Sequence, residues 1–160
     1  MTIDELNRLS QSEFTETFGE IFEASPWVAE RAWARRPFAS IDALHAAMVA
    51  EVEHASREEQ LALLRAHPDL GTRTRMSAAS VGEQSGAGLD RLTPEEHAEL
   101  TRLNAAYRDR FGFPFLFAVK GSTRHDILRS LRQRVAGSPE EEFRVALEQV
   151  FRIARGRLEG

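Results

Sequence analysis

Residues 93–111 read TPEEHAELTRLNAAYRDRF, and this stretch contains a full set of signals for an amphipathic helix. Thr93 and Glu96 are spaced as a capping box, in which each side chain accepts a hydrogen bond from the other residue's backbone N–H. Pro94 occupies the first helical position, where its missing N–H leaves no intrahelical bond unmade. Apolar side chains follow at helical spacing: Leu100, Leu103, Tyr107 and Phe111. We therefore predict a long helix with one face in the core.

The same signals recur on both sides of this helix. Other hydroxyl–acid pairs at capping spacing are Thr2/Glu5, Ser10/Glu13, Ser56/Glu59 and Ser138/Glu141. Apolar stripes of helical period lie at 14–22, 41–52, 61–64, 127–135 and 143–158. No stretch alternates at length as a strand does, and Pro114 argues against a central strand at 113–119. The sequence predicts an all-α fold, a single compact domain over residues 1–160 with about seven to nine short helices.

The composition limits the class of protein. With 160 residues, 42% hydrophobic and 29% charged, the chain has the character of one globular domain. It has no cysteine, which excludes disulfides and thiolate chemistry. The net charge is −4 and basic residues are interleaved with acidic ones, so we expect no nucleic-acid partner. The longest uncharged stretch, 111–119, is too short to span a bilayer, and the polar N-terminus differs from a secretory signal. We expect a cytoplasmic protein with no membrane partner.

Three segments interrupt the helical pattern: HPDLG (67–71), SVGEQSGAGLD (80–90) and FGFPFLFAVKG (111–121). Irregular segments carried by a rigid frame are where binding and catalysis concentrate. None of them has the ligand spacing of a metal site or a phosphate-binding glycine motif, and the histidines show no i,i+4 pair. We therefore expect no metal and no nucleotide cofactor.

His67 stands where a helix must end, because Pro68 disfavours helical geometry in the residue before it. It is either a histidine that favours the helix dipole or a general acid or base, since imidazole titrates near neutrality. Glu83 and Gln84 likewise allow two interpretations. They belong either to a solvated glycine-rich loop or to a site for a ligand rich in amide, urea or hydroxyl groups. The residue types alone leave both choices open.

The apolar segment 113–121 is either a buried connector or a pocket wall that offers backbone N–H and C=O groups to a ligand. Arg157, near the end of the last predicted helix, is either solvated or a bidentate partner for a substrate carboxylate. Neither segment nor residue identifies a reaction by itself.

Taken in order, the motifs resemble those of the 2-oxo-4-hydroxy-4-carboxy-5-ureidoimidazoline (OHCU) decarboxylases of urate degradation. The motifs are HPDLG at 67–71, S-x-x-E-Q-x-x-A-G-L-D at 80–90 and FPF-x-x-AVKG at 113–121. Supporting segments are SPWVAERAW (25–33), RPF (36–38), TRHDIL (123–128) and RIARGRL (152–158). The resemblance extends over residues 14–158 without large insertions.

The resemblance implies an all-helical homodimer without a cofactor that converts the ureidoimidazoline acid to (S)-allantoin and carbon dioxide. It implies that His67 is the catalytic acid and that Glu83 assists it. The implied substrate contacts are Pro68, Ser80, Val81, Gly82, Glu83, Gln84, Phe115, Leu116, Phe117, Ala118, Val119 and Arg157. Arg155 lies two residues from Arg157 and is the alternative to it.

Two other functions stay open. A non-enzymatic helical interaction module would use residues 111–117 as an exposed patch for a partner. A different cofactor-free enzyme on the same fold would act on a related ureido or imidazolone acid.

Overall fold

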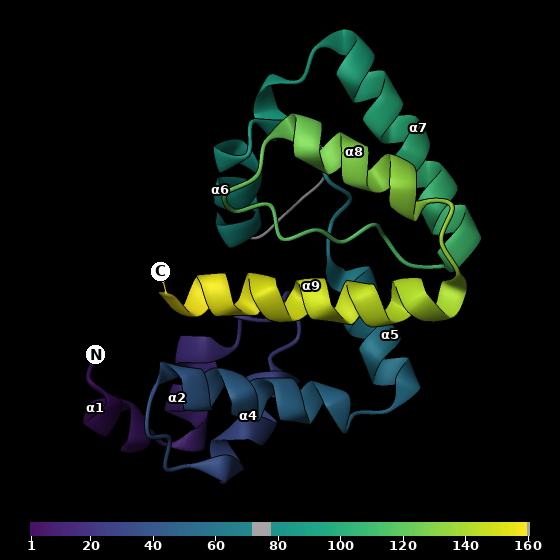
Figure 1. Cartoon of the computed structure of the whole chain (residues 1–160). Helices are drawn as coiled ribbons and strands as arrows, with labels where there is room; N and C mark the ends of the chain where they lie inside the picture. Colours follow the sequence, from purple (N-terminus) through teal and green to yellow (C-terminus); the bar gives the residue numbers. More distant parts are fainter. Residues whose placement is uncertain (72–77, 160) are drawn as a thin grey trace. The chain divides into compact units, whose positions relative to one another are not determined.

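The computed structural model describes residues 1–71 and 78–159, with the backbone alone for residues 78–81 (Figure 1). In these residues all regular secondary structure is helical, which confirms the predicted all-α fold. The α-helices are α1 (Ile3–Asn7), α2 (Gln11–Phe18), α3 (Trp27–Ala32), α4 (Ile41–Glu53), α5 (Arg57–Ala66), α6 (Ala78–Gly86), α7 (Pro94–Phe111), α8 (Arg124–Arg134) and α9 (Pro139–Glu159). Two 3₁₀ turns are η1 (Trp33–Arg35) and η2 (Leu89–Arg91). No helix in the described residues is long and apolar enough to cross a membrane.

The predicted capping signals begin the helices where they were expected. Full capping boxes precede α1, α2 and α7, with Pro94 at the start of α7. The Ser56/Glu59 pair exchanges both bonds before α5, and the N–H of Glu141 donates to the hydroxyl of Ser138 in α9. A further box at Thr123 and Asp126, not predicted from the spacing, starts α8. Each cap satisfies backbone N–H groups that have no partner within the helix.

Two local predictions were wrong. The stripe at 14–22 predicts one helical face, but α2 ends at Phe18 and a turn follows at Gly19. Phe22 is still buried, because burial of an aromatic ring requires packing and not a helix. The second error concerns the irregular segment predicted over residues 80–90, since its first part, 80–86, belongs to α6.

The chain divides into two compact units, one formed by Met1–Ala66 with the residues from Ala154 onward, the other by His67–Ile153. In the first unit, α3 packs on α2 and α4. Phe14, Leu44 and Met48 from these helices are fully buried, and the ring of Phe14 stacks on Phe38 at 5.9 Å.

The second unit contains the three segments singled out in the sequence. Helices α7 and α8 pack together, and the irregular chain that joins them runs between α8 and α9 (Figure 1). Tyr107 of α7 is fully buried. The centroid of its ring lies 4.5, 6.0 and 5.5 Å from the ring centroids of Phe111, Phe113 and Phe115. This aromatic cluster anchors the start of the joining segment to α7.

Candidate active site

His67 is the first residue after α5, and its side chain is buried. Its exposed fraction is 5%, while Pro68 beside it is half-buried. Helix α5 ends at Ala66, as the proline predicted. The imidazole is therefore shielded from bulk water. In such an interior position, electrostatic interactions are stronger than at the protein surface.

The backbone that follows His67 is tied to α7 by two side chains. Asn104 donates from Nδ2 to the carbonyl of Leu70 at 3.0 Å in a buried hydrogen bond. Arg108 pairs through Nη2 with Oδ1 of Asp69, also at 3.0 Å. Asn104 and Arg108 are four residues apart, so they lie on the same face of α7. The segment 67–71 is thus held along that face.

Gly71 ends this segment in a conformation that suits glycine. Its φ is +74°, in the left-handed region where a Cβ is unfavourable. A Cβ at this position would lie 2.5 Å from Cδ2 of Leu100, so α7 and the backbone approach each other closely here. The N–H of Gly71 donates to Oε1 of Gln84 at 2.9 Å, which ties the segment to α6 as well.

Helix α6 carries the acid and amide that the sequence singled out. Gln84 is buried, Glu83 is half-buried and Gly82 is exposed. Glycine is a poor helix former, about 1 kcal/mol worse than alanine, but the tie between Gln84 and Gly71 is one tertiary contact that offsets this preference. The side chains of Ser80 and Val81, two predicted contacts, lie outside the described residues.

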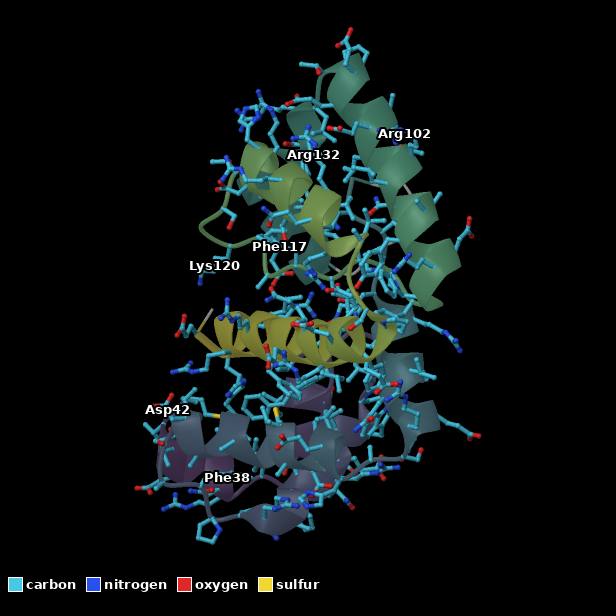
Figure 2. The ribbon with its side chains drawn as sticks, turned by 45° about the vertical axis from the view of Figure 1, so that its right-hand side comes forward. Phe38, Asp42, Arg102, Phe117, Lys120 and Arg132 are labelled. Carbon is cyan, nitrogen blue, oxygen red and sulfur yellow. The ribbon has the colours of Figure 1, made fainter. Side chains whose placement is uncertain are left out.

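The backbone of segment 113–119 is hydrogen-bonded to side chains of two helices. Its carbonyl at Leu116 accepts from Nη1 of Arg134 at 2.6 Å, at the end of α8. Its N–H at Ala118 donates to Oε1 of Gln149 at 2.9 Å, on α9. The side chains of Phe115, Leu116 and Val119 are buried, whereas Phe117 and Ala118 are half-buried; Figure 2 labels Phe117 on this segment.

Behind this segment lies a buried polar network. Arg134 Nε donates to Oε1 of Glu142 at 2.9 Å, and the hydroxyl of Tyr107 donates to the same oxygen at 2.7 Å. The guanidinium also covers the ring of Phe115, at 4.6 Å from its centroid. Burial, and then the hydrogen bond to Glu142, raise the pKa of Tyr107 well above its ordinary value. The phenol is therefore a fixed neutral donor.

Helix α7 brings the two irregular segments to one place. Asn104 holds Leu70 and, three residues later, Tyr107 packs on Phe115. Residues three apart are neighbours on a helix face. The backbone after His67 and the start of the 113–119 segment therefore lie next to each other on α7.

The groups assembled in this unit are suited to proton transfer and hydrogen bonding. They include the His67 imidazole, the Glu83 carboxylate and the amide of Gln84. No group of three or more histidine, aspartate or glutamate side chains suited to hold a metal ion occurs among the residues described. The unit thus contains an acid–base residue together with donors and acceptors that suit a polar ligand.

A sequence profile described as OHCU decarboxylase matches residues 7–159. The chain belongs to the OHCU decarboxylase family. It is 52% identical over 158 residues to the 2-oxo-4-hydroxy-4-carboxy-5-ureidoimidazoline decarboxylase of Haloferax volcanii, covering 99% of this chain and 94% of that one. It is 49% identical to the uric acid degradation bifunctional protein of Bacillus subtilis, covering 98% of this chain and 32% of that one. A crystal structure of (S)-allantoin synthase is similar with a TM-score of 0.80 and 38% identity, covering 99% of this chain and 53% of that one.

In this member of the OHCU decarboxylase family, Arg157 belongs to the first unit. Its Nη2 lies 2.9 Å from Oε2 of Glu23, and both side chains are only 6% exposed. Arg155, the alternative, pairs with Asp42 at 2.7 Å and with Glu159 at 3.3 Å. Arg157 is thus the more buried of the two, and its contact with substrate stays a prediction.

The residues that hold the irregular segments of this family member are not evident from the sequence motifs. Asn104 offered a signal, since it is a polar residue four positions after Leu100 on an apolar helix face. Arg134 and Gln149 offered none, because they resemble the surface residues around them. Their partners lie 18 and 31 residues away in the chain, so only the fold reveals them.

Proposed function

We propose that this protein decarboxylates 2-oxo-4-hydroxy-4-carboxy-5-ureidoimidazoline, releasing carbon dioxide and giving (S)-allantoin. The observation that carries the proposal is the position of a buried histidine, His67, at the head of a segment tied to α6 and α7. Membership of the OHCU decarboxylase family supports the same reaction. One catalytic domain over residues 1–160 performs it.

The reaction makes few demands on the protein. The bond between the hydroxyl-bearing ring carbon and the carboxyl group breaks, and its electron pair moves toward the adjacent C=N bond of the ring, which leaves an enol. A proton is then added to one face of the neighbouring ureido-bearing carbon, and loss of the hydroxyl proton turns the enol carbon into the ring carbonyl of (S)-allantoin. Because the substrate contains its own electron sink, the reaction requires no cofactor. The protein must hold the carboxylate out of the conjugated plane and deliver the proton to one face, and a positioned proton donor contributes typically about 10²–10⁴-fold.

His67 is the acid in this scheme, since imidazole exchanges protons near neutral pH. Glu83 assists this acid and binds hydroxyl or N–H groups of the substrate. Gln84 and Ser80 bind the ureido and ring polar groups. Arg157 binds an anionic or carbonyl oxygen, for which the planar guanidinium is suited.

The remaining predicted contacts frame the substrate. Pro68 lies beside the acid, and Val81 and Gly82 extend the α6 surface. The segment formed by Phe115, Leu116, Phe117, Ala118 and Val119 forms a wall that excludes water and offers backbone groups. Exclusion of water strengthens the electrostatic interactions on which proton transfer depends.

The alternative of an interaction module requires an exposed apolar patch at residues 111–117. Phe113, Phe115 and Leu116 are buried instead, and among the described residues the one large hydrophobic side chain that is exposed is Met1. Burial of the segment argues against a partner surface there. A related ureido or imidazolone acid as substrate remains the competing enzymatic hypothesis.

The protein acts as a cytoplasmic homodimer in this proposal. Light scattering on the purified chain tests the assembly: the expected mass is twice 18.0 kDa, and a mass of 18.0 kDa across the working concentration range would contradict it.

The activity is tested by generating the short-lived substrate from urate with the two preceding enzymes of urate degradation and adding this protein. Circular dichroism follows the product. Rapid formation of (S)-allantoin is the expected result. Formation of racemic allantoin at the spontaneous rate would refute the proposal, and conversion of only a different ureido acid would favour the competing hypothesis.

A further inference from the structure

The hydrogen bonds from Arg134 and to Gln149 fix the peptide groups on either side of Phe117. Arg134 holds the carbonyl of Leu116, and Gln149 holds the N–H of Ala118. A trans peptide is planar, and its C=O and N–H point in opposite directions; the cis bond that the described residues contain lies elsewhere, at Arg36–Pro37. The N–H of Phe117 therefore points away from Arg134, and the C=O of Phe117 points away from Gln149.

These two groups of Phe117 are polar atoms that the segment can present beside the two bonds that fix it. Among the described residues, no hydrogen bond to a protein group uses either of them. Phe117 is half-buried, and backbone N–H and C=O groups are strong hydrogen-bonding groups that take a partner from protein, water or ligand. A donor and an acceptor on one residue match a ureido group, which also carries both. Their direction is set by Arg134 and Gln149.

The contribution of the Arg134–Glu142 ion pair to the stability of the fold does not by itself explain the position of Arg134. Its side chain is 13% exposed and that of Glu142 is 6% exposed. Removing two charges from water offsets most of the attraction between them, so a buried ion pair contributes little net stability. The geometry is specific, however. The planar guanidinium binds Glu142 through Nε and the carbonyl of Leu116 through Nη1 at the same time, and lysine has no such fork.

We propose that Arg134 and Gln149 are positioning residues that orient the N–H and C=O of Phe117 toward the substrate. The inference rests on the proposed function. Tyr107 and Glu142 complete the support, because they fix the guanidinium that binds the Leu116 carbonyl.

Gln149 provides the sharper test, because two variants of similar size differ in whether they keep an acceptor oxygen at this position. Gln149→Glu keeps an oxygen that accepts from the N–H of Ala118, whereas Gln149→Met removes it. We expect Gln149→Met to raise the KM for the freshly generated substrate and the Kd for (S)-allantoin, the probe ligand, by about tenfold or more. Gln149→Glu should restore both to within about threefold of the wild type.

Arg134→Lys tests the hydrogen bond to the Leu116 carbonyl, and Arg132→Lys is its control. Both arginines lie on α8, but Arg132 is exposed and pairs with Glu99 at the surface, and Figure 2 labels it. Arg134→Lys should weaken binding of (S)-allantoin as Gln149→Met does, while Arg132→Lys should match the wild type. The thermal midpoint of each variant shows that the comparison is made on folded protein.

The outcomes separate the two proposals. If the wild type is active and binds (S)-allantoin, but Gln149→Met and Arg134→Lys have unchanged KM and Kd and only lower thermal midpoints, both residues are merely structural and the inference is overturned. Should Arg134→Lys fail to fold, the Gln149 pair decides alone. A wild-type chain without decarboxylase activity would overturn the proposed function, and the inference with it.

Discussion

Replacing Gly71 with alanine should destabilise the protein by about 2–5 kcal/mol. Gly71 has φ of +74°, and the left-handed conformation costs an L-residue roughly 1–2 kcal/mol. The added Cβ would lie 2.5 Å from Cδ2 of Leu100, whose side chain is 1% exposed and cannot move into solvent. Overpacking of this kind costs about 1–3 kcal/mol, and the two effects act together.

Urea unfolding followed by far-UV circular dichroism measures the change. With a slope of about 2 kcal/mol per molar urea, the midpoint of Gly71→Ala should fall by roughly 1–2.5 M. Gly82→Ala is the matched control. Gly82 is inside α6. Among the described residues, no atom outside its chain neighbours and the backbone of its own helix lies within 4 Å of a Cβ built there, so alanine should stabilise the helix by about 1 kcal/mol. If Gly71→Ala were as stable as the wild type while Gly82→Ala behaved as expected, the reasoning about Gly71 would be wrong.

Three further predictions concern the chemistry. His67→Asn should lower kcat by about 10²–10⁴-fold with little change in KM, and near-normal turnover would remove His67 from the mechanism. Glu83→Ala should lower kcat and raise KM, whereas unchanged steady-state kinetics would make Glu83 a surface acid. Because burial raises the pKa of Tyr107 in the folded state, the unfolded chain releases this proton first as the pH rises above about 10. The free energy of unfolding should then fall by up to about 1.4 kcal/mol per pH unit, and pH-dependent urea titrations should show a shallower decline for Tyr107→Phe.

The helices that begin with local caps were predictable, and α6 shows where local signals fail. Ser10 with Glu13 and Thr93 with Glu96 are three residues apart, so the sequence itself contains the hydrogen-bond partners. In α6, Gly82 suggested a loop, and the contact of Gln84 with the Gly71 backbone, 13 residues away, is the kind of interaction that local propensity does not include.

In the candidate site, too, the sequence identifies residues and the structure shows how they are placed. The order of the three motifs identified the family and singled out His67, Glu83 and the 113–119 segment. This was possible because the chemical properties of these residue types do not depend on the fold. The roles of these residues remain predictions. That His67 is buried at the head of a segment tied to α6 and α7 became visible only in the structure.

The sequence by itself determined an all-helical chain, the family and the residues able to transfer a proton, since helix periodicity, caps and ordered motifs are all written in local spacing. Only the tertiary structure decided what holds those residues in place. Asn104 reaches Leu70, Arg134 reaches Leu116 and Gln149 reaches Ala118 across 34, 18 and 31 residues of chain. Such contacts arise from the packing of α7, α8 and α9 around irregular backbone, and the hydrogen bonds that direct a peptide group have no signature in the neighbouring residues.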